Sequence, residues 1–553
     1  MTMVKRGQNN QQVGLNIVGS SVFGRYPKIS QERTINMFIS DSFLVDYAGY
    51  EIIIPSTQLA NGKQGRGIFT STKLGKLVVV IDQFVYLISI TFNQANDEAL
   101  IDQVTPIGEL QTNTGIVYIT ENNKPQILIS DLVHLYIYDA TAPSAVKIVP
   151  NLTFTPGYVT FHDTYFIAAA SNDTGGGSTQ NNTWRLSAQN EGYETAPGVN
   201  AWPYDRFSVG TLQTKPDNVQ AVVRFPSKGN MILVMGSIVS EAWFDTGSQL
   251  FPYQRTNQFN IDYGCLSPAS VAYMDELVVW LAANEKSGPI IMYSDGGMPK
   301  KITTDGIDFL FSELIAPQDS QGFLYRQDGH LFYHINFYTD NLSLFYDFMT
   351  DKFFHASDQN LNYFIAAEIA FFDNQYYFVS RNTGNLYAFD TSFTTYEDVV
   401  SDENSESSYF IIPRIRICKN IRLPSQDYFI LNDVGFTMES GETQYYQQDG
   451  TAIPVDFALL LGVSFFLLDG TQFELLEEDI PLTQDTPVVF LSVSYDGGAV
   501  FGNEWSYQLP GIGYRRNRVM WWQGGLVNDA VCQFRFESRG RVLATDGVAN
   551  IRV

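Results

Sequence analysis

The chain of 553 residues contains little cysteine, histidine or positive charge. Its three cysteines, Cys265, Cys418 and Cys532, are far apart, so neither a disulfide framework nor a Cys-x-x-Cys metal site is indicated, and a reducing compartment is expected. Lysine and arginine number 34 against 59 acidic residues, which gives a net charge of −25. Proteins that grip nucleic acid need clustered lysine and arginine to neutralise phosphates, so that class is disfavoured; the acidity can equally serve solubility.

Long hydrophobic runs are also missing. The most apolar segment, 457–468, lies between Asp456 and Asp469 and is too short for the ~20 residues that a bilayer requires. Near the N-terminus, Lys5 and Arg6 are followed by polar residues rather than by the apolar stretch of a secretory signal. We therefore expect no membrane segment and no export.

Aromatic and apolar residues are abundant. Hydrophobic residues make up 44% of the chain and aromatic residues 14%, against 17% charged residues. This balance favours half-buried, pleated surface over exposed helix. The length exceeds one ordinary hydrophobic core, so the composition predicts an all-β protein with several domains or one large repeat.

A loose repeat runs through residues 77–390. Each unit has an apolar run, a short polar turn and an aromatic-rich run, as in 77–81 with 84–90, 158–161 with 164–169, and 368–372 with 375–379. Such units are typical of β-hairpins. About seven units spaced by roughly 40 to 50 residues predict an irregular six- or seven-bladed β-propeller; stacked β-sandwich domains are the alternative.

The pattern divides the chain into segments. We expect residues 1–60 to help close the propeller, residues 61–395 to form it, and the acidic residues 396–409 to link it to a second, β-sandwich-like domain over 410–553. Within that domain, 438–486 is a candidate insertion. The Gly-, Ser- and Asn-rich segment 171–183 is expected to be a long mobile loop.

One tripeptide resembles a protease signature. Asp245-Thr246-Gly247 matches the active-site sequence of aspartic proteases, and Asp173-Thr174-Gly175 offers a second copy. Two carboxylates that share a proton are what this chemistry requires. The copies lie too close to belong to two lobes, and Asp-Thr-Gly is common in β-turns, so we interpret both as turns.

The sequence evidence for other catalytic or metal sites is equally weak. His330 and His334 have the spacing of a helical metal pair, but the sequence around them is strand-like. Glycoside hydrolysis requires two carboxyl groups at a defined distance from each other, and a sequence does not show that distance. There is no phosphate-binding loop, dinucleotide fingerprint or serine nucleophile elbow. We therefore expect no catalytic residue, no metal and no cofactor.

The C-terminal domain gathers arginine and tryptophan. The residues concerned are Arg414, Arg416, Arg515, Arg516, Arg518, Trp521 and Trp522. Arginine beside tryptophan is typical of protein interfaces, and this is our first interpretation; phosphate contact and a merely solvated surface are the alternatives.

Several short motifs, in a fixed order, resemble one known family. They are 32–38 (ERTINMF), Gly49-Tyr50, Pro55, 65–68 (GRGI), 229–237 (GNMILVMGS), 241–244 (EAWF), 263–265 (YGC), 295–297 (DGG), 493–498 (VSYDGG) and 511–522. In this order they resemble the packaged-DNA stabilisation proteins, also called tail accessory, hub or nozzle proteins, of short-tailed double-stranded DNA phages.

The resemblance implies a structural role in a virion tail assembled in the host cytoplasm. It implies a homohexameric ring below the portal and its adaptor, which extends the DNA channel and retains packaged DNA until ejection. A tail needle or plug, fibres or spikes would be further partners, and DNA would pass without sequence-specific binding. An acidic wall would let it slide. The alternatives are a propeller-based polysaccharide-degrading enzyme, a receptor-binding tail protein, or a propeller scaffold for cytoplasmic partners.

Overall fold

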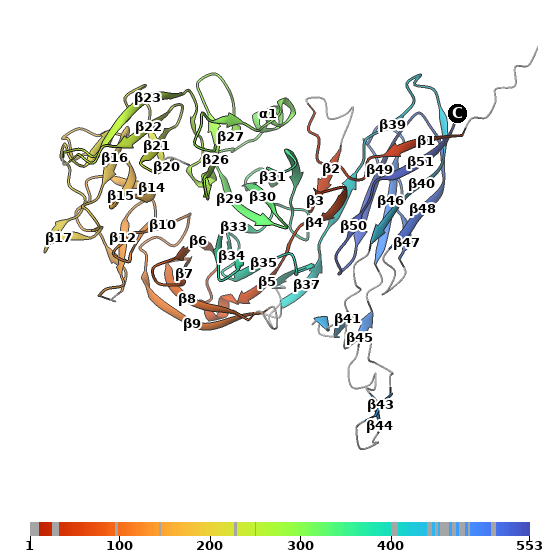
Figure 1. The fold of residues 1–553 in the computed structure, drawn as a ribbon, viewed down its shortest axis with the longest axis horizontal. Helices are drawn as coiled ribbons and strands as arrows, with labels where there is room; N and C mark the ends of the chain where they lie inside the picture. The colour runs from red at the N-terminus through yellow and green to blue at the C-terminus, as the bar shows by residue number, and fades with distance from the viewer. Residues whose placement is uncertain are drawn as a thin grey trace, which may run out of the picture. The chain divides into compact units, whose positions relative to one another are not determined.

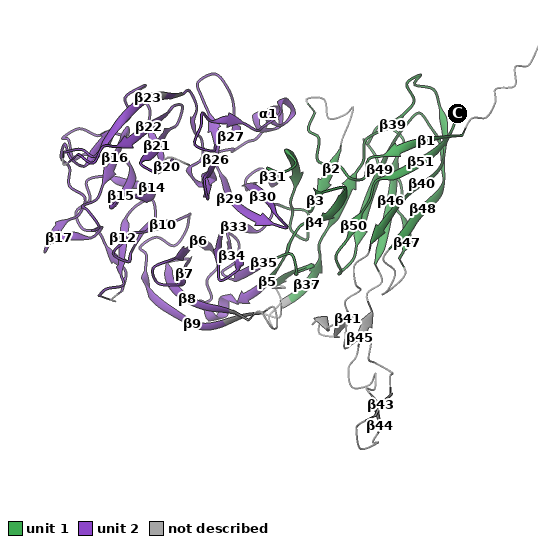
Figure 2. Ribbon diagram, viewed as in Figure 1, with its two compact units in different colours: residues 1–51, 344–362, 390–553 green, residues 52–343, 363–389 purple. Residues whose placement is uncertain are grey.

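The computed structural model describes most of the chain. The described residues are 10–24, 32–93, 98–142, 145–225, 229–248, 250–399, 407–439, 445–447, 452–453, 464–466, 472–474, 482–484, 487–509 and 516–553. Their regular secondary structure is strand, apart from one α-helix, α1 (Asp305–Ser312), and two short 3-10 helices (Figure 1). The predicted all-β class is therefore confirmed. The chain divides into two compact units (Figure 2).

Unit 2 comprises residues 52–343 and 363–389 and consists of antiparallel sheets that follow one another along the chain. Among the described residues six such sheets have three or more strands in this unit, and a further two-stranded one joins β17 (Glu194–Ala196) to β18 (Val199–Asn200). The first three contain β6 (Gly65–Ser71), β7 (Lys76–Ile81), β8 (Phe84–Asn93) and β9 (Glu98–Glu109); β10 (Tyr118–Glu121), β11 (Gln126–Ser130), β12 (Leu135–Asp139) and β13 (Lys147–Ile148); and β14 (Thr155–His162), β15 (Tyr165–Ser171), β16 (Thr183–Leu186) and β19 (Val209–Thr211).

The remaining sheets continue the series. They contain β20 (Val219–Arg224), β21 (Met231–Gly236), β22 (Ser240–Asp245) and β23 (Tyr253–Ile261); β24 (Gly264–Cys265), β25 (Ala272–Met274), β26 (Leu277–Ala283), β27 (Ile290–Ser294) and β28 (Lys300–Lys301); and β33 (Ala366–Phe372), β34 (Gln375–Ser380) and β35 (Leu386–Asp390). The hairpin of β29 (Ser320–Gln327) and β30 (His330–Phe337) stands between the last two sheets. Neighbouring sheets touch in sequence order, and β33 touches β6, so the ring closes (Figure 2). The predicted six- or seven-bladed propeller is confirmed.

Polar two-residue turns join many of these strands. Asp82, Asp163, Asp275 and Asp373 begin such turns, each with a positive φ of 43 to 52°. Aspartate tolerates this left-handed conformation better than most residues do. The hairpins predicted from the sequence therefore form at the expected places, because the turn residues and the flanking apolar runs agree.

Unit 1 comprises residues 1–51, 344–362 and 390–553, and its core lies between two sheets. One sheet has the order β1-β51-β40-β50-β4-β3, with β48 paired to β40. Its strands are β1 (Asn10–Leu15), β3 (Met37–Ser40), β4 (Phe43–Asp46), β40 (Phe429–Glu439), β48 (Asn517–Val527), β50 (Leu543–Ala544) and β51 (Gly547–Arg552). Within unit 1 the other sheet has the order β31-β32-β2-β38-β49-β46-β47, where β31 is Leu342–Asp347, and β39 (Ile421–Arg422) also pairs with β49. The remaining strands of this sheet are β2 (Arg33–Ile35), β32 (Lys352–His355), β38 (Arg414–Ile417), β46 (Val488–Ser494), β47 (Trp505–Gln508) and β49 (Asp529–Glu537).

Both sheets contribute to one hydrophobic core. Phe436 of β40 and Trp521 of β48 pack with Phe534 and Phe536 of β49. Two sheets that cover one another in this way form a β-sandwich. The predicted sandwich-like C-terminal domain is confirmed, and the strands β1 to β4 of the N-terminal segment are part of the same unit.

The expected domain limits and the two units do not coincide everywhere. Residues 1–51 lie in unit 1, whereas β5 (Gly49–Ile54) follows β35 in the strand order of the last propeller sheet. The predicted acidic linker 396–409 overlaps β36 (Thr395–Val399) and β37 (Ser407–Ile411), which pair with each other. The candidate insertion 438–486 contains the short strands β41 (Tyr445–Gln447), β42 (Ala452–Ile453), β43 (Ser464–Phe466), β44 (Gln472–Glu474) and β45 (Leu482–Gln484). Apart from these strands and the end of β40, the predicted insertion lies outside the described residues.

Candidate functional site

Two arginines of the predicted interface, Arg414 and Arg416, are interior residues of unit 1. Their strand β38 is paired on both edges, to β2 and β49, and all four of its residues are buried. Arg416 Nη2 lies 3.1 Å from Glu32 Oε2, and Arg414 Nε lies 2.9 Å from Asp46 Oδ1. A buried arginine needs such a carboxylate partner. Both faces of β38 are covered, so neither arginine can contact another molecule, and the prediction that they belong to an interface is wrong.

The other described members of that set lie on or beside β48 in the opposite sheet of unit 1. Trp521 is 7% exposed, packs in the core, and donates its indole N–H to the carbonyl of Trp505 at 3.0 Å. Trp522, the next residue, is 64% exposed. Arg516 and Arg518 are exposed, and their side chains have no partner among the described residues. Arg515 lies outside the described residues.

Trp522 belongs to an exposed apolar surface. Leu526 of β48 and Ile430 of β40 are direct cross-strand partners, 67% and 40% exposed, and Val548 of β51 is 37% exposed. We call the set Arg518, Trp522, Leu526, Ile430 and Val548 the β48 face. An exposed apolar surface that includes tryptophan and arginine is typical of a protein-binding site. The sequence predicted the residue types but not which of the two tryptophans points outward.

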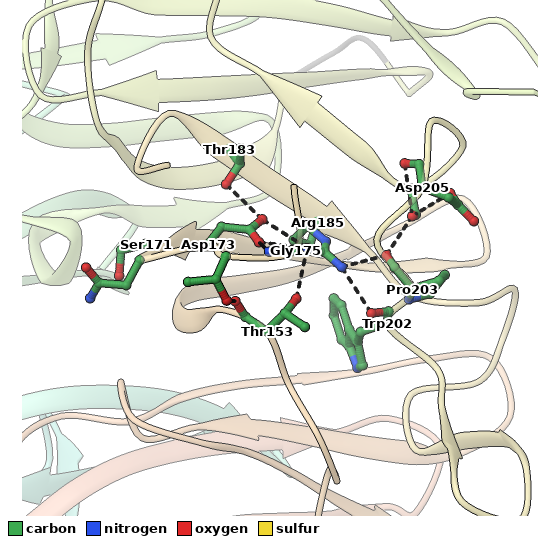
Figure 3. Close-up of polar contacts among 12 residues, drawn as sticks. Thr153, Ser171, Asp173, Gly175, Thr183, Arg185, Trp202, Pro203 and Asp205 are labelled. Atoms are coloured by element: carbon green, nitrogen blue, oxygen red, sulfur yellow. Dashed lines mark hydrogen bonds and ion pairs between the residues drawn. The ribbon is translucent and has the colours of Figure 1, made fainter. Parts of the chain in front are cut away.

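In unit 2, the glycine-rich segment after β15 is anchored by a buried ion pair (Figure 3). Arg185 Nη1 lies 2.9 Å from Asp173 Oδ2, and both side chains are fully buried. Arg185 Nη2 also donates to the carbonyls of Trp202 and Pro203, at 3.1 and 2.6 Å. The predicted mobile loop is thus fixed at Asp173, and that carboxylate is occupied by the arginine rather than free for protease chemistry.

Aromatic rings enclose the same guanidinium group. The rings of Phe154 and Tyr204 lie 5.0 and 4.9 Å from Arg185 Cζ. The loop packs closely on Tyr204, since a Cβ added at Gly175 or Gly176 would come within 2.2 to 2.3 Å of that side chain. The glycines are therefore required by close approach and do not by themselves indicate mobility.

A cavity of about 400 Å³ lies beside this loop. It is formed where β10, β14 and β20 begin, and its walls include Tyr118, Tyr158, Asn172, Asn218 and Gln220. The size falls in the roughly 300 to 1,000 Å³ range of small-molecule sites. Sequence reasoning missed this cavity because its polar residues come from four separate segments.

A second cavity, of about 740 Å³, contains a pair of carboxylates. Asp245 Oδ1 accepts a hydrogen bond from the Gly247 N–H at 2.7 Å, which confirms the predicted turn. A hydrogen bond with Asp245 is the largest cause that raises the pKa of Asp163 to about 6. The partner of Asp245 is therefore Asp163 and not Asp173.

The two histidines do not form a metal site. His330 and His334 both lie on strand β30 and are buried. His334 Nε2 is 2.9 Å from Asn336 Oδ1, its ring stacks on Phe323 at 4.7 Å, and burial lowers its pKa to about 3. No group of three metal-ligating side chains occurs in the described part of the chain.

Comparison with known proteins supports one family. Residues 199–394 match the model of a family of phage stabilisation proteins whose description is "Bacteriophage P22 Gp10, beta-propeller". The resemblance seen in the sequence is confirmed over these residues. No curated protein matches the chain. No helix among the described residues is long and apolar enough to cross a membrane.

Solved propeller structures are only distantly similar. An inactive virginiamycin B lyase from Staphylococcus aureus is 9% identical, with a TM-score of 0.38, over 62% of this chain and 99% of the lyase. The N-terminal domain of Nup159 is 10% identical, with a TM-score of 0.37, over 65% of this chain and 98% of that domain. PorZ of Porphyromonas gingivalis is 13% identical, with a TM-score of 0.32, over 66% of this chain and 39% of PorZ.

Proposed function

We propose, from the premise that residues 199–394 match the phage stabilisation family, that this chain is a tail hub protein. Copies of it form a homohexameric ring below the portal and its adaptor in the virion. The ring extends the DNA channel and retains packaged DNA until ejection. The family match is the observation that carries this proposal, and the role requires no catalytic residue.

The charge of the chain agrees with a channel wall. With 34 basic and 59 acidic residues, the protein repels DNA phosphates on balance. A basic wall would bind the passing DNA by releasing its counterions and would slow its movement. An acidic wall lets the double helix pass without sequence-specific contact, and retention then depends on geometry, when a later needle or plug closes a narrowed exit.

The β48 face supplies a surface for assembly. It presents Trp522 and Leu526 together with Arg518 and the neighbouring Arg516, while the rest of the chain is strongly acidic. We infer that this face joins the chain to an acidic surface of another ring member or of the adaptor. Electrostatic complementarity would steer the encounter, and burial of the aromatic side chain would hold it.

The direct test is DNA retention. Particles made without this protein should fill with DNA and then lose it, because packaged DNA is under pressure and nothing else in the proposal closes the channel at that stage. The measurement is DNA per purified capsid, with and without the protein, over a range of salt. Added wild-type protein should stop the loss only when it is supplied before the DNA has left.

A different outcome would favour another class of tail protein. If depleted capsids keep their genomes but fail to adsorb to cells, the chain is an adhesin or a depolymerase rather than a hub. The carboxylate pair Asp163 and Asp245 is the feature on which an enzymatic function would have to depend.

A further inference from the structure

The cavity beside the glycine-rich loop of unit 2 has walls without charge. Its polar side chains are Thr155, Ser171, Asn172, Asn181, Asn218 and Gln220, and the other lining residues are apolar, glycine or tyrosine. Sites for phosphate or carboxylate groups use charged donors, and sites for divalent cations use carboxylates. The lining therefore favours an uncharged ligand.

A half-buried acid near the cavity does not alter this conclusion. Glu368 of β33 interacts electrostatically with both Tyr118 and Tyr158. Burial raises the pKa of Glu368 to about 8, although the N–H of Ile68 donates to its Oε2 at 3.2 Å. The glutamate is therefore mostly protonated at neutral pH.

The cavity walls hold unused hydrogen-bonding groups. Among the described residues, the side-chain amides of Asn172, Asn218 and Gln220 and the hydroxyls of Tyr118 and Tyr158 have no hydrogen-bond partner. Each amide offers donors and an acceptor, and each hydroxyl offers both. The two tyrosine rings lie with centroids 4.8 Å apart and add an aromatic wall.

The loop that carries Asn172 is held in place before any ligand arrives. The Asn172 N–H donates to Asn181 Oδ1 at 2.7 Å, which ties the two ends of the loop together. The adjoining Asp173 is fixed by Arg185 (Figure 3). A preorganised wall lowers the entropic cost of binding.

We propose that this cavity binds a neutral saccharide. A sugar ring carries several hydroxyl groups, each able to donate and accept a hydrogen bond, and it has less polar faces that can lie against tyrosine. An extended peptide would instead use a free strand edge, whereas this cavity is built from strand beginnings and loops. The site goes beyond the hub function and does not depend on it.

The test is ligand-observed NMR on the full chain. Neutral sugars (glucose, rhamnose and N-acetylglucosamine) are compared with the charged sugar glucuronic acid. We expect saturation transfer to at least one neutral sugar and none to glucuronic acid. Replacing two wall amides together, the exposed Asn218 and the half-buried Gln220 (Asn218→Ala with Gln220→Ala), should weaken binding by about tenfold or more, because polar groups of the sugar lose their partners. The control is Asn123→Ala, an exposed asparagine that is not among the lining residues.

Two results would overturn the proposal. One is the absence of binding by every neutral sugar of the panel at millimolar concentration. The other is binding that persists unchanged in the double variant. Tyr158→Phe removes a single hydroxyl and is a second check; a melting temperature equal to that of the wild type shows that any loss is local.

Discussion

Arginines of unit 1 serve two different purposes. Arg414 and Arg416 on β38 are fully buried and paired with Asp46 and Glu32, whereas Arg516 and Arg518 beside and on β48 are exposed and without partners in the described residues. The first pair connects segments that are far apart in the sequence. The second pair is left available to another molecule. Arginine content alone therefore does not locate an interface. Whether an arginine can contact another molecule depends on where its strand lies within the sandwich.

The difference between buried and exposed arginines is tested most sharply by measuring the stability of variants. Arg416→Met should lower the free energy of unfolding by about 3–5 kcal/mol, because Glu32 would be left buried without its counter-ion. Arg518→Met should change it by less than about 0.5 kcal/mol, as expected for an exposed residue without partners. Denaturant unfolding followed by tryptophan fluorescence measures both. Equal effects of the two substitutions would remove the distinction.

In an assembly assay, by contrast, the exposed arginines should matter more than they do for stability. Arg516→Glu combined with Arg518→Glu should leave unfolding unchanged but block addition of the protein to particles that carry portal and adaptor. Reversed charges at an interface cost several kcal/mol when they are buried without partners. The matched control is Lys63→Glu with Lys73→Glu, two exposed lysines of unit 2. If the β48 variant joins particles as the control does, the interface is elsewhere.

The sequence predicted local structure well and long-range contacts poorly. Aspartates at the turns, such as Asp82 and Asp275, identified hairpins because turn preference is a property of a few adjacent residues. The burial of Arg416 depends on Glu32, far away along the chain. Likewise, alternation along β48 predicts that Trp521 and Trp522 face opposite ways, but only the packed sheets show which one is buried.

A half-buried acid without a basic partner in the described part of the chain extends the comparison to unit 2. Glu368 has a pKa of about 8 in the folded protein, against an ordinary value of 4.5. The folded state therefore binds a proton that the unfolded state releases, and this stability is present below about pH 4.5 and is lost as pH rises to about 8. Glu368→Gln should be more stable than the wild type at pH 9, by about 1–3 kcal/mol, and close to it at pH 5. Melting temperatures at the two pH values test this; no difference between them would contradict it.

The smallest effect is expected where two like charges meet at the surface. The neighbouring Asp245 raises the pKa of Asp163 to about 6, because two carboxylates side by side disfavour each other's charge. In Asp245→Asn the amide can donate to the Asp163 carboxylate, which relieves that repulsion and returns the pKa of Asp163 toward its ordinary range. Virion assembly and infectivity should remain close to those of the wild type, since a turn and not a protease dyad is altered.

Asp163→Asn is the matched control and should behave in the same way. The measurements are particle yield, plaque titre and the cleavage pattern of the virion proteins. If both variants assemble normally but lose one proteolytic cleavage, the carboxylate pair is catalytic, and the absence of catalysis in the proposed function is wrong.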